Sequence, residues 1–152
     1  MFIPGQPLSA IVLIAEDNKF DRTILKRAFA AAGSTAEIRF FVDGQDLLDH
    51  LLSLGDQEEH EPTPALVLLD LYMPRLSGKE TLQQIRNDDR LRPVPVVILT
   101  SSDHEQHVQE MYSLGANSYL VKPSDFDDLV DTVTGFHRFW SGAARLPKIP
   151  IS

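Results

Sequence analysis

Short apolar runs alternate with amphipathic stretches along this chain from Ile11 onward. The runs occupy residues 11–15, 36–42, 65–69, 95–99 and 118–121. This alternation is typical of parallel strands joined by crossover helices. The first, third and fourth runs are apolar without alternation, which indicates strands covered on both faces near the middle of a sheet. We therefore expect an α/β domain of the (βα)5 type, in which a five-stranded parallel sheet lies between two layers of helices.

The stretches between the runs have the spacing of amphipathic helices. We expect helices at residues 21–32, 44–54, 77–87 and 103–114, and a fifth that starts with Ser124 as its N-cap. In the first helix Ile24, Leu25, Ala28 and Phe29 recur at helical spacing, and Gly33 follows where a left-handed C-terminal cap belongs. The third and fourth helices carry few apolar residues. In the fifth helix the residues that we expect to be buried are Phe126, Leu129, Val130 and Val133.

The length of 152 residues suits a single domain. Its core is expected at about residues 10–140, with an N-terminal arm at 1–9 and a C-terminal tail at 141–152. The absence of cysteine excludes disulfides, zinc-thiolate sites, iron-sulfur clusters and thiol catalysis. The net charge of −8 disfavours nucleic acid and anionic lipid as partners, and no apolar run approaches the length of about 18 residues that crosses a bilayer. We expect a cytoplasmic protein that binds neither nucleic acid nor membrane.

Acidic residues follow two strands at the edge where an open parallel sheet places its ligand site. Glu16 and Asp17 come directly after the first run, and Asp70 ends the third. Thr100 ends the fourth run and Lys122 follows the fifth. Three carboxylates in one crevice would repel one another and raise at least one pKa unless a cation neutralised them. The sequence therefore predicts a cation at this edge.

The ligand types define the kind of cation and its chemistry. A few carboxylates with open positions favour a hard ion, and they suit Mg²⁺ completed by water and a phosphate. Lys122 supplies a positive charge for the same anion, and Thr100 supplies a hydroxyl donor. With a carboxylate nucleophile, these are the parts that hold a transferred phosphoryl group. The residues thus predict phosphoryl transfer.

The full set of motifs resembles the receiver domain of two-component response regulators. It consists of Glu16-Asp17, Asp70 with Met73-Pro74 and Gly78 behind it, Thr100, Tyr119 and Lys122-Pro123. Spaced motifs in strand order are far more specific than any one of them. The spacings between Asp70, Thr100 and Lys122 are those usual in this family, whereas the spacing from Asp17 to Asp70 is longer, with the surplus in an acidic loop at 55–64.

The resemblance implies a fold, a reaction and a set of roles. The fold is flavodoxin-like, with strand order 2-1-3-4-5 and helices on both faces. Asp70 accepts a phosphoryl group from a sensor histidine kinase and loses it by slow hydrolysis, so the chain is no dedicated enzyme. The implied Mg²⁺ ligands are Glu16, Asp17, Asp70 and the backbone carbonyl of Tyr72. Thr100 and Tyr119 form the switch, and Tyr72 and Ser102 occupy positions that tune the lifetime of the acyl phosphate.

The same residues also allow structural interpretations. An acidic pair after a strand is most often a solvated turn, and Thr100 could satisfy a strand end. Tyr119 could be plain core, and Lys122 could form a structural salt bridge with Asp70. Asp70 itself needs a partner or a cation, because a buried unpaired carboxylate is costly.

Other functions share some of these features with the receiver domain. A haloacid-dehalogenase-like phosphatase also uses a strand-end aspartate, but it carries a second aspartate two residues later, where this chain has Tyr72. A flavodoxin-type nucleotide binder needs a hydroxyl- or glycine-rich loop where this chain has residues 16–18. A scaffold that works without phosphorylation is the third alternative. A metal site made by His104, Glu105, His107 and Glu110 is disfavoured, because they fit the solvated face of a helix.

About a dozen residues follow the fifth helix, too few for a DNA-binding or catalytic output module. We therefore expect a stand-alone receiver that acts through protein contacts or a phosphorelay. The termini are apolar and flanked by proline, so we expect them to pack against the domain or a second copy of it, and we favour a homodimer. The pair Phe139-Trp140 followed by Leu146-Pro147 is similar to single-domain regulators that serve bacterial phytochrome-type histidine kinases.

Overall fold

The computed structural model describes residues 10–55 and 63–149. Strands and helices alternate along the chain as predicted. They are β1 (Ile11–Ala15), α1 (Lys19–Ala31), β2 (Glu37–Phe41), α2 (Gly44–Gly55), β3 (Thr63–Leu69), α3 (Gly78–Asn87), β4 (Val96–Thr100), α4 (Glu105–Ser113), β5 (Ser118–Val121) and α5 (Phe126–His137). A π-helix at Arg138–Ala143 and a two-residue strand, β6 (Lys148–Ile149), follow α5.

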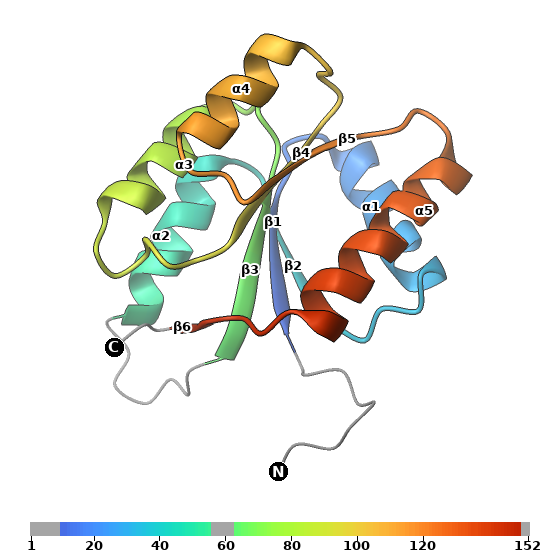
Figure 1. The fold of residues 1–152 in the computed structure, drawn as a ribbon, viewed down its shortest axis with the longest axis horizontal. Coiled ribbons are helices and arrows are strands. Elements are labelled where there is room, and N and C mark those ends of the chain that lie inside the picture. Colours follow the sequence, from blue (N-terminus) through green and yellow to red (C-terminus); the bar gives the residue numbers. More distant parts are fainter. Residues whose placement is uncertain (1–9, 56–62, 150–152) are drawn as a thin grey trace.

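The main sheet is parallel and has the order β2-β1-β3-β4-β5, which confirms the expected flavodoxin-like arrangement (Figure 1). At the end of β1, Ala15 is paired with Phe41 of β2 and Leu69 of β3. Ile98 of β4 is paired with Leu69 on one side and Tyr119 of β5 on the other. This register brings the carboxyl ends of β1, β3 and β4 to one edge of the sheet.

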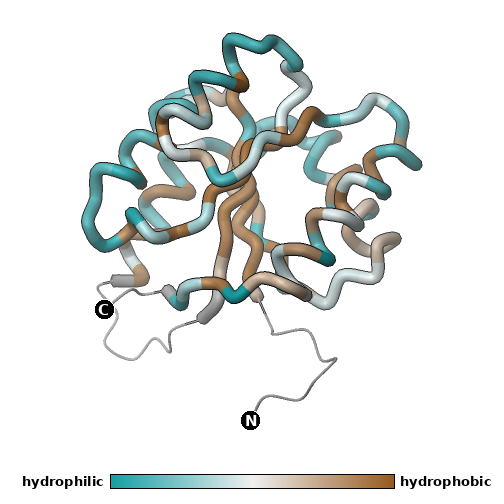
Figure 2. Tube along the Cα trace, viewed as in Figure 1, coloured by the Kyte–Doolittle hydropathy of each residue, from teal (hydrophilic) through white to brown (hydrophobic). Residues whose placement is uncertain are grey.

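Helices cover both faces of the sheet. In Figure 1, α2, α3 and α4 lie on one side, and α1 and α5 lie on the other. Neighbouring residues of β1 serve the two cores: Leu13 packs with Leu82 of α3, and Val12 packs with Leu25 of α1 and Leu129 of α5. Figure 2 shows the apolar residues gathered in the strands and the hydrophilic residues on the outer surfaces of the helices. This distribution follows from the opposite directions of successive side chains in a strand.

The helix ends follow local sequence rules. The side chain of Asn18 caps α1 by accepting from the backbone N–H of Asp21. Ser77 and Glu80 form a reciprocal capping box at the start of α3. Gly33, after the end of α1, has φ +74°, which fits the left-handed cap predicted for it. The first two caps fix where the chain enters α1 and α3, and Gly33 marks where it leaves α1.

Three predicted details are wrong. The N-cap of α5 is Asp125, not Ser124, because the carboxylate of Asp125 accepts from the backbone N–H groups of Asp127 and Asp128. Phe126 is 43% exposed because it lies in the first turn, ahead of the stripe that α5 buries. Ile24 is 39% exposed and lies beside the buried stripe of α1.

The chain after α5 lies on the domain. The π-helix carries Trp140 back onto the core between the sheet and α1 and α5, and Leu146 packs on the same core. β6 then pairs antiparallel with the first residues of β3, so that β3 begins at Thr63, two residues before the predicted strand. The described part of the tail therefore packs against its own domain, which is one of the two arrangements expected. The N-terminal arm at 1–9 and the acidic residues 56–62 lie outside the described residues.

Within the described residues, no helix is both long and apolar enough to cross a bilayer.

Candidate functional site

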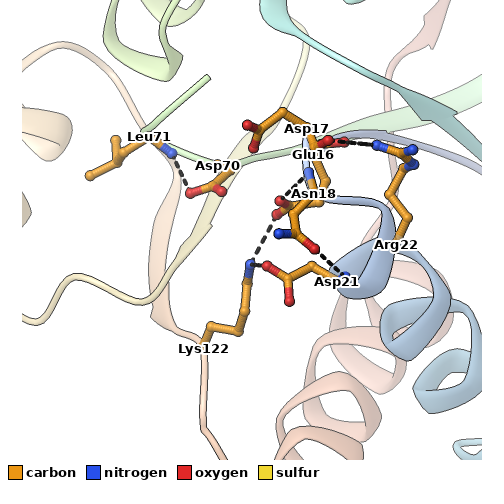
Figure 3. Close-up of polar contacts among 8 residues, drawn as sticks. All are labelled: Glu16, Asp17, Asn18, Asp21, Arg22, Asp70, Leu71 and Lys122. Atoms are coloured by element: carbon orange, nitrogen blue, oxygen red, sulfur yellow. Dashed lines mark hydrogen bonds and ion pairs between the residues drawn. The ribbon is translucent and has the colours of Figure 1, made fainter. Parts of the chain in front are cut away.

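Three carboxylates meet at the carboxyl edge of the sheet. Glu16 and Asp17 follow β1, and Asp70 follows β3, the strand beside it. One carboxylate oxygen from each of the three residues lies within 4.8 Å of the others (Figure 3). Among the described residues this is the one acidic or histidine cluster with the geometry of a metal site. The pairing of β1 with β3 thus brings together side chains that are more than fifty positions apart in the sequence.

Glu16 is the most buried member of this acidic cluster, with 2% of its surface exposed. Its Oε1 accepts from the backbone N–H of Asn18 at 3.1 Å, and its Oε2 accepts from Nζ of Lys122 at 2.9 Å. Burial and the neighbouring charge of Asp70 raise the pKa of Glu16 to about 7, although the bond from Lys122 acts in the opposite direction. The crevice therefore carries more negative charge than Lys122 balances, which is the condition that a bound cation relieves.

Lys122 reaches the acidic cluster from the end of β5. Its Nζ contacts Glu16 at 2.9 Å and Asp21 of α1 at 3.4 Å. The salt bridge with Asp70 that the sequence allowed is not among the described contacts (Figure 3). The Oδ1 of Asp70 instead accepts from the backbone N–H of Leu71 at 2.7 Å. Burial acts to lower the pKa of Lys122, but the bond to Glu16 and the nearby acidic charges outweigh it, so that the pKa is raised and Lys122 stays charged.

The turn that holds Glu16 and Asp17 is fixed by a residue that sequence analysis did not single out. Arg22 of α1 donates through Nη1 to the backbone carbonyls of Glu16 and Asp17, each at 2.9 Å (Figure 3). In this turn only the N-cap at Asn18 has a recognisable sequence signal, because asparagine is one of the residues preferred at the start of a helix. An arginine that donates to backbone carbonyls has no such signal, because its partners can be carbonyls of any residue type. The role of Arg22 therefore could not be predicted from the sequence.

Thr100 ends β4, the strand next to the one that carries Asp70. It has 0% of its surface exposed, and its Oγ1 has no hydrogen-bond partner among the described residues. A buried hydroxyl without a partner is costly and calls for an explanation. This unsatisfied donor lies at the same edge of the sheet as the acidic cluster.

Tyr119 of β5 is half-buried, and its hydroxyl donates to the backbone carbonyl of Ser102 at 2.8 Å. Burial raises the pKa of the Tyr119 hydroxyl, and the negative charges of Asp103 and Asp70 add to this effect. Tyr119 therefore packs against the core, as one interpretation held, and it also contacts the segment that follows Thr100. Tyr72, two residues after Asp70, is 59% exposed.

Gly78 lies against the strand end that carries Asp70. A Cβ at this position would lie 2.1 Å from the backbone oxygen of Asp70 and 2.8 Å from Cα of Leu71. The N–H of Gly78 donates to the carbonyl of Leu71 at 2.9 Å. Only glycine fits this approach, so the start of α3 fixes the backbone of Asp70 and Leu71.

The loop between β3 and α3 is also held by a pair of carboxylates. Arg75 has φ +63°, which is unusual for a residue with a side chain. Its guanidinium binds the buried carboxylate of Asp43 at 2.6 and 3.1 Å and that of Asp46 at 2.5 Å. The bonds from Arg75 hold the pKa of Asp43 below its usual range. The sequence does not reveal this contact, because Arg75 lies about thirty residues from Asp43 and Asp46 along the chain.

The donor set suits a hard divalent cation. It consists of carboxylate oxygens from the acidic cluster, with no sulfur and no imidazole, and such ligands are those of Mg²⁺ and Mn²⁺. Protonation or a cation would relieve the repulsion that raises the pKa of Glu16. The residues present therefore fit the expected Mg²⁺.

Comparisons with known proteins agree with the site. The family model described as the response regulator receiver domain matches residues 12–134. The probable methanogenesis regulatory protein FilR2 of Methanothrix harundinacea is 41% identical over 138 residues, which are 90% of this chain and 87% of that protein.

Two solved structures extend this likeness to the fold. The response regulator RPA3017, described in red light signaling of R. palustris, is 39% identical with a TM-score of 0.81, over 91% of this chain and 98% of that one. The phosphorylated cyanobacterial phytochrome response regulator RcpA is 33% identical with a TM-score of 0.80, over 91% of this chain and 99% of that one. With its strand order, its acidic cluster and these matches, the chain belongs to the family of response regulator receiver domains.

Proposed function

We propose that Asp70 accepts a phosphoryl group from a phosphohistidine of a sensor histidine kinase in a reaction that requires Mg²⁺. A carboxylate oxygen of Asp70 attacks phosphorus, the phosphorus–nitrogen bond of the donor breaks, and the histidine nitrogen leaves with its electron pair. The observation that carries this proposal is the buried hydroxyl of Thr100, which lacks a partner among the described residues and ends the strand beside Asp70. A phosphoryl oxygen on Asp70 would supply the missing acceptor.

The ligands that we propose for Mg²⁺ are Glu16, Asp17, Asp70 and the backbone carbonyl of Tyr72. When bound, the cation neutralises the charge that develops on the phosphoryl oxygens. The chain prepares this site through Arg22, which fixes the carbonyls of residues 16 and 17, and through the clamp from Arg75 to Asp43 and Asp46, which holds the loop after Tyr72.

The steps after phosphoryl transfer involve three residues that bind the phosphoryl group or respond to it: Lys122, Thr100 and Tyr119. Lys122 already lies among the carboxylates, where its charge is available to pair with a phosphoryl oxygen on Asp70. If Thr100 turns toward the phosphoryl group, the segment with Ser102 moves with it, and the hydroxyl of Tyr119 is bonded to that segment. We infer that this linkage transmits phosphorylation to the surface made by α4, β5 and α5.

The kinase partner that we propose is of the phytochrome type, and we place the reaction in the cytoplasm. The likeness to RPA3017 and to RcpA supports this choice, because red light signaling and a phytochrome are named for those two proteins. The likeness to FilR2 shows that similar chains serve other regulatory systems. Co-purification of this chain with a candidate kinase, followed by transfer of labelled phosphate from kinase to chain, tests the pairing.

We also propose a homodimer. Phe139, at the start of the π-helix, is 56% exposed beside Trp140, with the two ring centroids 5.1 Å apart. An exposed aromatic side chain next to a half-buried one is suited to contact with a second copy. Size-exclusion chromatography with light scattering tests this: a monomer at micromolar concentration, unchanged by phosphorylation, contradicts the dimer.

The decisive experiment is intact mass after incubation with Mg²⁺ and a small acyl-phosphate donor. We expect the wild-type chain to gain one phosphoryl group, and we expect no gain in Asp70→Asn or in the presence of a chelator. If the wild type gains nothing from the small donor or from kinase, the scaffold alternative is favoured and the proposal fails.

A further inference from the structure

α4 has few apolar anchors and is held mainly by polar contacts. Within the described residues Met111 is its one buried side chain. Near its end, the hydroxyl of Tyr112 accepts from the backbone N–H of Tyr119 at 3.2 Å, and Glu110 forms an ion pair with Lys79 of α3. A helix with so little buried apolar surface depends on such contacts for its position.

At the start of α4 the polar contact is made by His107. Its Nδ1 lies 2.6 Å from Oγ of Ser102 and 3.3 Å from the hydroxyl of Tyr72. The rings of Tyr72 and His107 meet edge to face, with centroids 6.1 Å apart. Because Nδ1 offers one proton or one lone pair, Ser102 is its main hydrogen-bond partner and Tyr72 makes the longer contact with the same nitrogen. His107 thereby contacts side chains that come from the ends of two different strands.

These two strand ends carry the site. Tyr72 lies two residues after Asp70 and Ser102 lies two residues after Thr100, and β3 and β4 are neighbours in the sheet. The contacts of Tyr72 and Ser102 with His107 therefore join the segment that follows Asp70 to the segment that follows Thr100. Because Tyr72 is 59% exposed, little other packing keeps it there.

We propose that His107 is a positioning residue that holds Tyr72 and Ser102 across the mouth of the site, and that it thereby limits the access of water to the phosphoryl group on Asp70. In the hydrolysis that it slows, water attacks phosphorus, the bond between phosphorus and the Asp70 oxygen breaks, and the carboxylate and inorganic phosphate are released. His107 touches none of the reacting atoms and acts through Tyr72 and Ser102. This inference rests on the proposed phosphorylation of Asp70.

The test is the half-life of the acyl phosphate, followed by intact mass after the small donor has been removed. We expect His107→Leu and Tyr72→Phe each to shorten the half-life by about fivefold, the factor that corresponds to loss of one hydrogen bond of about 1 kcal/mol. The double variant should be no faster than either single variant, because both remove the same contact. His107→Asn, whose side-chain amide can occupy the place of Nδ1, should restore the half-life to within about twofold of the wild type.

Gln106→Ala is the matched control, since Gln106 is an exposed neighbour on α4. A half-life that is unchanged in His107→Leu, or that shortens equally in His107→Asn, overturns the inference. Thermal unfolding of each variant shows whether the fold is kept.

A second measurement does not depend on phosphorylation. Hydrogen exchange of the amides at residues 103–108 should be faster in His107→Leu than in the wild type and in Gln106→Ala, and unchanged exchange also overturns the inference. Failure of the wild type to form an acyl phosphate is instead a failure of the proposed function, and the exchange experiment still decides whether His107 holds this segment.

Discussion

The pKa of Glu16 predicts that the metal-free protein becomes less stable as the pH rises from 5 to 8. Its pKa of about 7 lies above the ordinary value of 4.5 for a glutamate, because the carboxylate is buried and lies beside Asp70. Between about pH 4.5 and about pH 7 the folded chain holds a proton at Glu16 that the unfolded chain has released. Stability falls with pH wherever the folded state binds more protons than the unfolded state.

The size of the effect follows from the size of the shift. Each pKa unit corresponds to about 1.4 kcal/mol, so the full shift of Glu16 represents on the order of 3 kcal/mol. This contribution is present below about pH 4.5 and lost above about pH 7. Mg²⁺ should oppose this loss of stability, because it binds the ionised carboxylates of the folded chain. The stabilisation grows as the Mg²⁺ concentration rises above the Kd of the site.

The assay is urea unfolding in the presence of a chelator at pH 5, 6, 7 and 8, followed by the fluorescence of Trp140, which is the single tryptophan of the chain. Other groups titrate in this range, so the informative quantity is the difference between the wild type and Glu16→Gln. The variant should lose most of the decline that Glu16 causes, whereas Glu105→Gln, at an exposed position, should keep it. Parallel profiles of the wild type and Glu16→Gln would refute the reasoning, as would a decline that Mg²⁺ leaves unchanged.

Three further predictions concern other residues. Gly78→Ala should cost about 1–3 kcal/mol of stability by overpacking and should impair phosphorylation, because its Cβ would collide with the backbone of Asp70; urea unfolding and intact mass check both effects. Ser141→Ala should raise the free energy of unfolding by about 1 kcal/mol, because the Ser141 hydroxyl is buried without a partner among the described residues; an unchanged or lower stability contradicts this. Lys122→Ala should retain some phosphorylation but lose the switch, so that phosphorylation no longer alters hydrogen exchange in α4 and β5, and undiminished kinase-dependent signalling by this variant contradicts the role.

The sheet and the acidic cluster could be predicted because both follow from short-range patterns. Apolar runs without alternation identify the central strands, and the rule that parallel strands end at one edge is sufficient to place Glu16, Asp17 and Asp70 together. The strand order itself came from the likeness to a family. Apolar periodicity identifies strands, but it does not say which strand lies beside which.

Contacts between distant polar side chains could not be predicted in this way. Lys122 pairs with Glu16 and Asp21 instead of Asp70, while Oδ1 of Asp70 accepts from the N–H of Leu71, and no local pattern distinguishes these carboxylates from one another. The contact of Arg75 with Asp43 is made by a residue with a positive φ angle, and an arginine in the sequence does not predict such an angle. The pairing of β6 with β3 involves two residues of each strand, which is too short for any periodicity.

The helices of the domain differ in how firmly they are held, and this difference indicates which part of the molecule can move. α1 and α5 pack directly on each other and on the sheet through Leu25, Phe29 and Phe136, with the rings of Phe29 and Phe136 6.0 Å apart. α4 has one buried apolar residue within the described chain and is otherwise tied by polar side chains to the strand ends of the site. Hydrogen bonds contribute little net energy each and can be exchanged at small cost, whereas a packed core resists movement. If a phosphoryl group draws in Thr100, it acts on the helix with the weakest anchorage, so we expect α4 and β5 to respond most strongly while the rest of the sheet stays in place.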